Sequence, residues 1–228
     1  MENANKMSYQ MLVLIATKKL ADRATELFLE KGFPIQYRIN AMGTASSEIM
    51  DTLGLGSIDK YLIITTIPKE YGNKLLAVLH TELRLDAVNS GIAFTVPLTG
   101  ASKIAVNMMN SIAEKEQTEK GMGDIIMSEN KFTLIAAVVD RGFSGEVMEA
   151  ARAAGAGGGT VVHSRGVESA EATGFWGLSV QEEKEVVLIL ANLDNKVEIM
   201  SAISEKCGMK SEAKGLVMSL PIDSVMGI

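Results

Sequence analysis

Two side chains that can bind an anion alternate along one short segment of the chain. His163 and Arg165 stand two residues apart in a run that begins at Thr160 and has the pattern of a β-strand, so they share one face of it. Arginine offers forked donors to carboxylates and phosphates, and histidine changes charge near neutral pH. The pair is therefore a candidate anion site, and the alternative is a solvated or interface face.

Glycines and lysines near this segment could complete such a site. The run 157–159 consists of glycine and Gly166 follows the strand, and glycine lets a ligand approach the backbone closely. The spacing matches neither a P-loop nor a dinucleotide fingerprint, so flexible turns are the alternative. Lys184, and Lys214 with its neighbour Gly215, could neutralise a phosphate as point charges, or could be solvated surface residues.

Residues for catalysis or soft-metal binding are scarce. The chain has two histidines and one cysteine. Cys207 continues an apolar helical stripe with Val197, Met200 and Ile203, which predicts a thiol in the core. His80 has no second ligand at metal spacing nearby. Because paired carboxylates and a nucleophile with a base at a recognised spacing are also missing, we expect no enzymatic activity and no metal site.

The amino-acid composition indicates a globular protein and argues against nucleic-acid binding and membrane insertion. The chain has 228 residues, 47% of them hydrophobic and 22% charged, which is typical of a globular protein. A net charge of −6 gives no basic footprint, so nucleic acid is not an expected partner. A single cysteine suits a reducing compartment. The apolar run 11–16 is too short for a membrane span or a typical secretion signal, so we expect a cytoplasmic protein without membrane insertion.

The chain contains two copies of one unit. Glycines and prolines recur in the same order at a nearly constant separation: Gly32 and Gly155, Gly43 and Gly166, Gly54 and Gly177, Gly91 and Gly215, Pro97 and Pro221. This repeat predicts an N-terminal unit at 1–99, a connecting helix and linker at 100–130, and a C-terminal unit at 131–228.

Hydrophobic periodicity predicts the order strand, helix, strand, strand, helix, strand in each copy. In the second copy we expect strands at 132–139, 160–165, 185–191 and 216–222, with helices at 145–154 and 195–207. This order predicts an α+β fold of two tandem ferredoxin-like βαββαβ units. Right-handed crossovers place both helices of a unit on one sheet face. The other face is also apolar, so we expect the sheets to pack against each other within an oligomer.

The second copy resembles the P-II nitrogen-regulatory signal proteins. Gly155, Thr160 and Gly166 match that family's segment from first helix to second strand, and residues 167–182 take the place of its long target-contacting loop. The first copy resembles the family more faintly, with Tyr37 in the place of Thr160. The resemblance implies P-II-like units assembled as trimers, which bind ATP or ADP, often with 2-oxoglutarate, in clefts between subunits.

The resemblance also indicates which residues would contact a ligand or a partner. Before its last strand the family has a glycine-rich turn and a lysine that hold phosphates, and here residues 211–215 contain fewer glycines and an acidic residue. The family's C-terminal arginines have no counterpart in 223–228. The ligands to consider are ATP, ADP or AMP, another small anion, or no nucleotide. The candidate ligand-binding residues are Thr160, His163, Arg165, Gly166, Lys184, Lys214 and Gly215. The candidate partner loop carries Phe175, Trp176 and Gly177.

From these features we expect a non-enzymatic P-II-like signal-transduction protein. It would sense a small metabolite at a cleft between units and signal through residues 167–182 to a target such as a transporter or an enzyme. We expect a homo-oligomer, as a trimer of tandem chains. The alternative is a ferredoxin-like trimeric metal-tolerance or structural oligomer without nucleotide binding, and an enzyme built on a ferredoxin-like barrel is the third hypothesis.

Overall fold

Helices and antiparallel strands make up the structure, a computed structural model. It describes residues 8–44, 59–87, 90–102, 106–107, 109, 131–165 and 183–227. The chain divides into two compact units, and the first contains Met1–Ile39, Tyr61–Asn130 and Ile222–Ile228. The second contains Asn40–Lys60 and Lys131–Pro221. The α+β prediction is confirmed.

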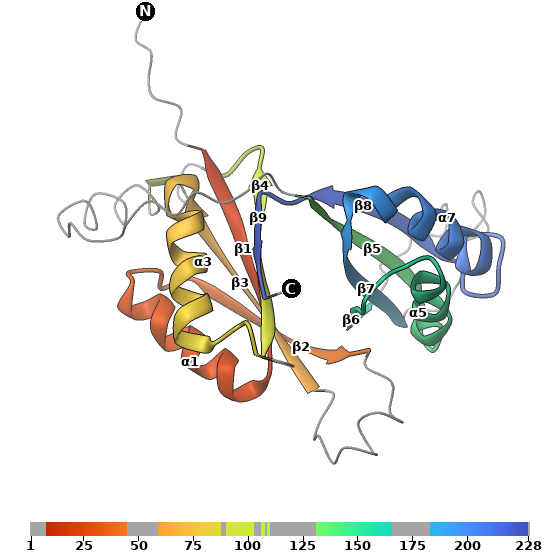
Figure 1. Ribbon diagram of the computed structural model, residues 1–228, viewed down its shortest axis with the longest axis horizontal. Helices are drawn as coiled ribbons and strands as arrows, with labels where there is room; N and C mark the ends of the chain where they lie inside the picture. Colours follow the sequence, from red (N-terminus) through yellow and green to blue (C-terminus); the bar gives the residue numbers. More distant parts are fainter. Residues whose placement is uncertain are drawn as a thin grey trace, which may run out of the picture. The chain divides into compact units, whose positions relative to one another are not determined.

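The first unit packs two helices against antiparallel strands (Figure 1). Its elements in chain order are β1 (Tyr9–Ala16), α1 (Lys18–Glu30), the start of β2 (Gln36–Gly43), β3 (Asp59–Pro68), α3 (Lys69–Leu83), β4 (Gly91–Leu98) and β9 (Ser224–Met226). Strands β3, β1, β4 and β9 lie side by side in that order, and β2 begins beside β3. Register is continuous along β1, from the pair Tyr9 and Leu98 to the pair Ala16 and Gly91.

One apolar core holds these helices on the strands. The buried stripe of α1 includes Ala24, Leu27 and Phe28, which pack with Leu12 and Leu14 of β1. Apolar residues three and four apart face one side of a helix, and alternate residues face one side of a strand. The same core receives α3, so both helices cover the same face of the strands.

The second unit repeats this element order (Figure 1). Its elements are β5 (Phe132–Asp140), α5 (Ser144–Ala153), β6 (Thr160–Arg165), β7 (Glu183–Asn192), the short 3-10 helix η1 (Leu193–Asn195), α7 (Lys196–Cys207) and β8 (Leu216–Pro221). Strands β8, β5, β7 and β6 are antiparallel neighbours in that order. Val147 of α5 and Ile199 of α7 share a core with Ile135, Val187 and Ile189.

Two segments belong to a different unit from the one expected for them, since the predicted units were 1–99 and 131–228. Residues 40–60 group with the second unit, where Met42 pairs with Val161 and Gly43 with Thr160. Residues 222–228 group with the first unit because β9 pairs with β4. A repeat shows which residues of the two copies are equivalent. It does not determine whether a strand pairs within its own copy or with the other copy.

The strand faces turned away from the helices are shielded from water at their centres. Val13 is 4% exposed and Phe94 is 1% exposed, although neither belongs to the core beneath the helices. In the second unit Leu134 is 7% exposed, whereas Leu216 and Met218 on the edge strand β8 are 53% and 39% exposed. The central strands are therefore buried on both faces, as their nearly continuous apolar runs predict.

One detailed prediction about apolar residues is wrong. The stripe of α7 does not include Val197, which is 68% exposed, because Ile199, Ile203 and Cys207 form the buried side at intervals of one helical turn. Tyr37 of β2, which takes the place of Thr160 in the repeat, is 64% exposed, whereas Thr160 is 8% exposed.

Several predicted segments lie outside the described residues. The connecting helix and linker at 100–130 is described only at 100–102, 106–107 and 109. The partner loop predicted at 167–182 also lies outside the described residues. Within the described ranges, no helix combines the length and apolar character that crossing a membrane requires.

Candidate functional site

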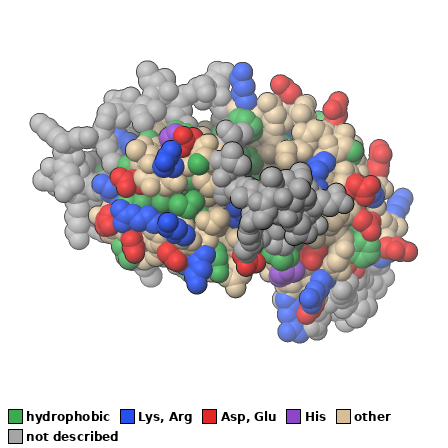
Figure 2. Space-filling model, turned by 60° about the horizontal axis from the view of Figure 1, so that its bottom comes forward, with side chains coloured by type: hydrophobic (Ala, Val, Ile, Leu, Met, Phe, Trp, Pro, Cys, Tyr) green, Lys and Arg blue, Asp and Glu red, His purple; other side chains and the backbone are tan. Residues whose placement is uncertain are grey.

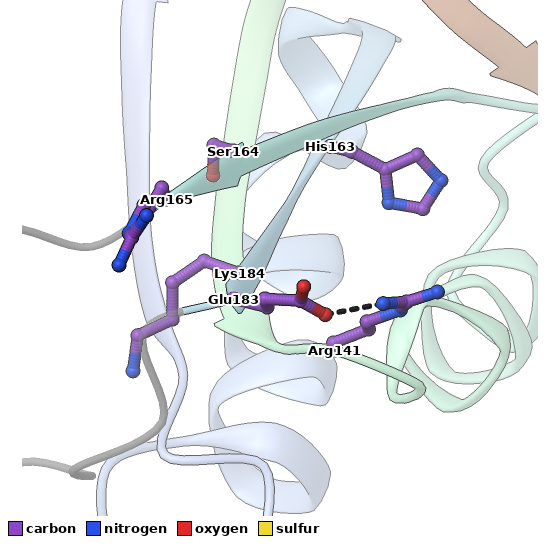
Figure 3. Close-up of a pocket in the computed structure, with 6 residues that line it drawn as sticks. All are labelled: Arg141, His163, Ser164, Arg165, Glu183 and Lys184. Atoms are coloured by element: carbon purple, nitrogen blue, oxygen red, sulfur yellow. Dashed lines mark hydrogen bonds and ion pairs between the residues drawn. The ribbon is translucent and has the colours of Figure 1, made fainter.

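An open pocket of about 560 Å³ lies in the second unit where the chain enters and leaves residues 166–182 (Figure 3). Its lining side chains are mainly cationic or polar: Arg141, His163, Ser164, Arg165, Glu183 and Lys184. Arg165 is the last described residue before that segment and Glu183 is the first after it. The structure therefore brings Lys184 together with His163 and Arg165, which the sequence analysis selected as a pair.

Antiparallel pairing of β6 with β7 sets the order of these side chains. His163 lies opposite Glu185, Ser164 opposite Lys184, and Arg165 opposite Glu183. Because directly opposite residues point to the same sheet face, His163 and Arg165 share a face with the two glutamates. Lys184 and its partner Ser164 belong to the other face of the sheet, although both line the pocket.

An exposed ion pair crosses the pocket. The guanidinium of Arg141, which follows β5, donates to the Glu183 carboxylate (Figure 3). This hydrogen bond and the guanidinium charge hold the pKa of Glu183 below its ordinary value, and the carboxylate in turn raises the pKa of Arg141. An anion entering the pocket would compete with Glu183 for Arg141.

A buried glutamate lies beside His163. The Glu185 side chain is 6% exposed, and its Oε1 lies 3.9 Å from His163 Nδ1. Its Oε2 accepts a 3.0 Å hydrogen bond from the backbone N–H of Ser144, the first residue of α5. A carboxylate at a helix N-terminus stabilises the helix through its unpaired N–H groups. Glu185 therefore has a structural role, and His163 is the side chain above it that faces the pocket.

Lys184 is held by a buried carboxylate. Its Nζ lies 2.6 Å from Asp140 Oδ1, and the two side chains are 11% and 6% exposed. Asp140 lies directly opposite Lys184 in the pairing of β5 with β7. The ammonium predicted to neutralise a phosphate is therefore already paired within the protein.

The glycine run before β6 is contacted by a residue of the same chain. Thr44 inserts its hydroxyl against Gly159, accepting from the Gly159 N–H at 2.8 Å and donating to the Gly159 carbonyl at 3.0 Å. Arg152 donates to the Thr44 carbonyl. Thr160 is 8% exposed and pairs with Leu188 rather than lining the pocket. These contacts favour a packing role for Gly159 and Thr160.

The turn that includes Lys214 and Gly215 uses its backbone donors internally. The Gly215 N–H donates to the Cys207 carbonyl at 2.8 Å, and the Lys214 N–H donates to the Ser211 carbonyl at 3.3 Å. Lys214 has a positive φ of 48°, a conformation that few non-glycine residues adopt. Neither residue lines the pocket. Gly166, Phe175, Trp176 and Gly177, also predicted to contact a ligand or partner, lie outside the described residues.

Sequence reasoning missed Arg141, Glu183 and Glu185. The alternation of Glu183, Lys184 and Glu185 at the start of a strand was a usable signal, because alternate residues share a face. Arg141 comes close through the turn after β5, where its N–H donates to the Glu183 carbonyl at 3.2 Å. On the face shown in Figure 2, acidic and basic side chains are interspersed, as they are in this pocket.

Cys207 is a buried thiol, as predicted, with no exposed surface. Burial raises its pKa above the ordinary thiol value. We expect a thiol reagent such as DTNB to react with the folded protein at least about a hundredfold more slowly than with protein in denaturant. Because the unfolded thiol ionises first, stability should also fall as pH rises above the ordinary thiol pKa. Rapid stoichiometric reaction of the folded protein would contradict a buried position.

The described residues contain no group of three or more His, Cys, Asp and Glu side chains placed to hold a metal ion. No family model matches the chain. No curated protein matches it either.

Among solved structures, similarity is found to the divalent ion tolerance protein CutA1 from Ehrlichia chaffeensis, with 13% identity and a TM-score of 0.34, over 47% of this chain and 96% of that one. A microcompartments protein from Desulfitobacterium hafniense is 11% identical with a TM-score of 0.27, covering 94% of this chain and 96% of that one. A protein described as a glycine cleavage system transcriptional repressor is 8% identical with a TM-score of 0.27, covering 94% and 98%. At TM-scores this low, these likenesses do not indicate what this chain binds or does.

Proposed function

We propose that this chain is a non-enzymatic P-II-like signalling protein that binds a small anionic metabolite in the pocket at the ends of β6 and β7. The observation that carries the proposal is that His163 and Arg165 line a pocket bordered by both ends of residues 166–182. Arg165 supplies a forked cationic donor and His163 a ring that can donate to an anion. The resemblance to P-II proteins makes adenine nucleotides and 2-oxoglutarate the first ligands to test.

The signal would be a shift in the population of conformations of residues 167–182. A ligand held by Arg165 and the start of β7 touches the chain on both sides of that segment, so it favours the conformations in which its contacts are made. A target protein that binds those conformations better would then respond to the ligand. The scaffold would be a tandem of ferredoxin-like units in a homo-oligomer, whose mass in solution measures the number of chains.

We expect replacement of Arg165 by alanine to weaken ligand binding at least about tenfold, because hydrogen bonds to charged groups are the strong ones. The measurement is calorimetric titration with ATP, ADP, AMP and 2-oxoglutarate. Lys206→Ala is the matched control, since Lys206 is a cation paired with Glu149 outside the pocket. No heat from any of the four ligands at millimolar concentration would contradict this assignment of ligands, and equal binding by the Arg165→Ala variant would exclude this pocket.

A structural oligomer without nucleotide binding is the second candidate. It is favoured by the partners that pocket side chains already have: Asp140 for Lys184 and Glu183 for Arg141. In that case the charged cluster would fix the ends of β5, β6 and β7. Titrations without heat, together with an unchanged oligomer mass in the Arg165→Ala variant, would support this candidate. Metal analysis of purified protein tests the metal-tolerance form of it.

A further inference from the structure

The C-terminal segment is bound to the first unit as an added strand. Strand β9 lies antiparallel to the edge of β4, with Ser224 opposite Thr95 and Met226 opposite Ala93. The N–H of Asp223 donates to the Thr95 carbonyl at 2.8 Å. Addition of an extended peptide to a sheet edge is a recurring mode of peptide recognition, in which main-chain hydrogen bonds give affinity and side-chain contacts give specificity.

Side chains of the first unit recognise successive residues of this segment. The Asp223 carboxylate accepts from Gln10 Nε2 and lies 3.5 Å from Lys69 Nζ. The Ser224 hydroxyl donates to Asn73 Oδ1 at 2.7 Å, and Ser224 is 9% exposed. Met226 packs against the apolar core of the first unit. The first unit therefore makes specific contacts with an aspartate at 223, a serine at 224 and an apolar residue at 226.

The surroundings are shaped for close approach of this segment. A Cβ on Gly227, whose φ is 89°, would overlap the Gly91 carbonyl oxygen. A Cβ on Gly72 would overlap Gln10 Oε1, so glycine at this position leaves room for the observed conformation of the glutamine that binds Asp223. Beneath the segment, Gln10 Oε1 and Thr95 Oγ1 are buried without hydrogen-bond partners. The polar side chains around the segment thus come from β1, α3 and β4.

The bound segment is nevertheless short and only partly protected. Strand β9 has three residues paired with β4, whereas β1 pairs with β4 along eight residues. The Lys69 and Asp223 side chains are 55% and 26% exposed, so solvent weakens their attraction. Short elements with few contacts open at lower free energy than the central strands. We therefore expect β9 to detach while the rest of the first unit stays folded.

We propose that the β4 edge is a recognition site for residues 223–227, and that a second copy of this chain can supply this segment in trans, so that two chains exchange β9. An exchanged strand makes the same contacts as a strand bound within its own chain. The equilibrium between single chains and exchanged pairs therefore depends on the connection between β8 and β9 and on the chain concentration. That connection is Ile222, because β8 ends at Pro221 and the recognised segment begins at Asp223. A short connection leaves little slack for the strand to bind within its own chain. This proposal does not depend on the ligand proposed above.

A charge exchange across two chains tests the proposal. Lys69→Glu and Asp223→Lys each place like charges together, within one chain or between identical chains. In a mixed pair that exchanges β9, both contacts become opposite in charge. The new lysine at position 223 can also donate to Gln10 Oε1, which has no partner in the native contact. We expect mixing the two full-length variants to give a two-chain species by native mass spectrometry that neither variant gives alone.

The double variant Lys69→Glu/Asp223→Lys is the matched control, because it restores opposite charges within each chain. In each single variant, the amide hydrogen-exchange rate of residues 223–227 should rise at least about tenfold. In the double variant and in the mixture, this rate should return toward the native value. Wild-type chains with light and heavy isotopes should also form mixed pairs. Absence of mixed pairs in both experiments, or unchanged protection of 223–227 in the single variants, would overturn the proposal.

Discussion

We expect replacement of Lys184 by methionine to lower the free energy of unfolding of the second unit by about 3 kcal/mol. The ammonium of Lys184 lies 2.6 Å from the Asp140 carboxylate, and both side chains are almost fully buried. Methionine fills a similar volume, but it leaves the carboxylate without its cation. A buried charge that loses its partner retains its desolvation cost without the compensating attraction, and this accounts for the size of the loss.

Denaturant unfolding, followed by hydrogen exchange of the β5 and β7 amides, measures this loss in the second unit. The matched control is Lys206→Met, because Lys206 Nζ lies at the same 2.6 Å from a carboxylate of Glu149, but these side chains are 38% and 74% exposed. Solvent screens that pair, so we expect little change in stability. Restoration by the double variant Lys184→Met/Asp140→Asn would confirm the unpaired charge as the cause. Equal effects of the two single lysine variants would contradict it.

The positions of the central strands could be predicted from sequence because burial on both faces leaves a clear pattern. Strand β5 was expected at 132–139 and is observed as Phe132–Asp140. The apolar runs of β5 and β7 are almost uninterrupted. Glycines with a positive φ, such as Gly32 after α1 and Gly155 after α5, mark where helices end. These signals are local, so one sequence is enough to locate them.

Strand β9 could not be predicted because its pairing is not local. Its three residues, Ser224, Val225 and Met226, carry no alternating pattern long enough to distinguish a strand from a loop. The segment becomes a strand through the edge of β4 and the side chains of Gln10 and Asn73, which are distant in sequence. Met42 and Gly43 pair with β6 in the second unit for the same kind of reason.

The candidate site was partly predictable. His163 and Arg165 were selected because alternation along a strand puts them on one face, and both line the pocket. The partners that decide the chemistry were not predictable, because they come from other elements: Asp140 lies opposite Lys184, and Ser144 donates to Glu185. Lys184 was expected to bind a phosphate. Cross-strand register, which a single sequence does not specify, instead places it in a buried ion pair with Asp140.

Replacement of Gly215 by alanine should lower the free energy of unfolding of the second unit by about 3 kcal/mol, at the upper end of the usual cost of overpacking. A Cβ at this position would overlap the Cys207 carbonyl oxygen and lie 3.0 Å from Val139 Cγ1. The Gly215 N–H donates to that same carbonyl at 2.8 Å, so moving the backbone away breaks a hydrogen bond. The clash therefore cannot be relieved by turning a flexible side chain.

Gly158→Ala is the matched control for this prediction, because nothing lies within 4 Å of a Cβ built there. Alanine at such a site restricts the unfolded chain, so stability should be unchanged or higher by up to about 0.5 kcal/mol. Denaturant unfolding compares the two variants, and alkylation of Cys207 gives a second readout, since a displaced β8 would open its surroundings. If Gly215→Ala left both the unfolding midpoint and the reactivity of Cys207 at native values, the close contact between this turn and the end of α7 would be wrong.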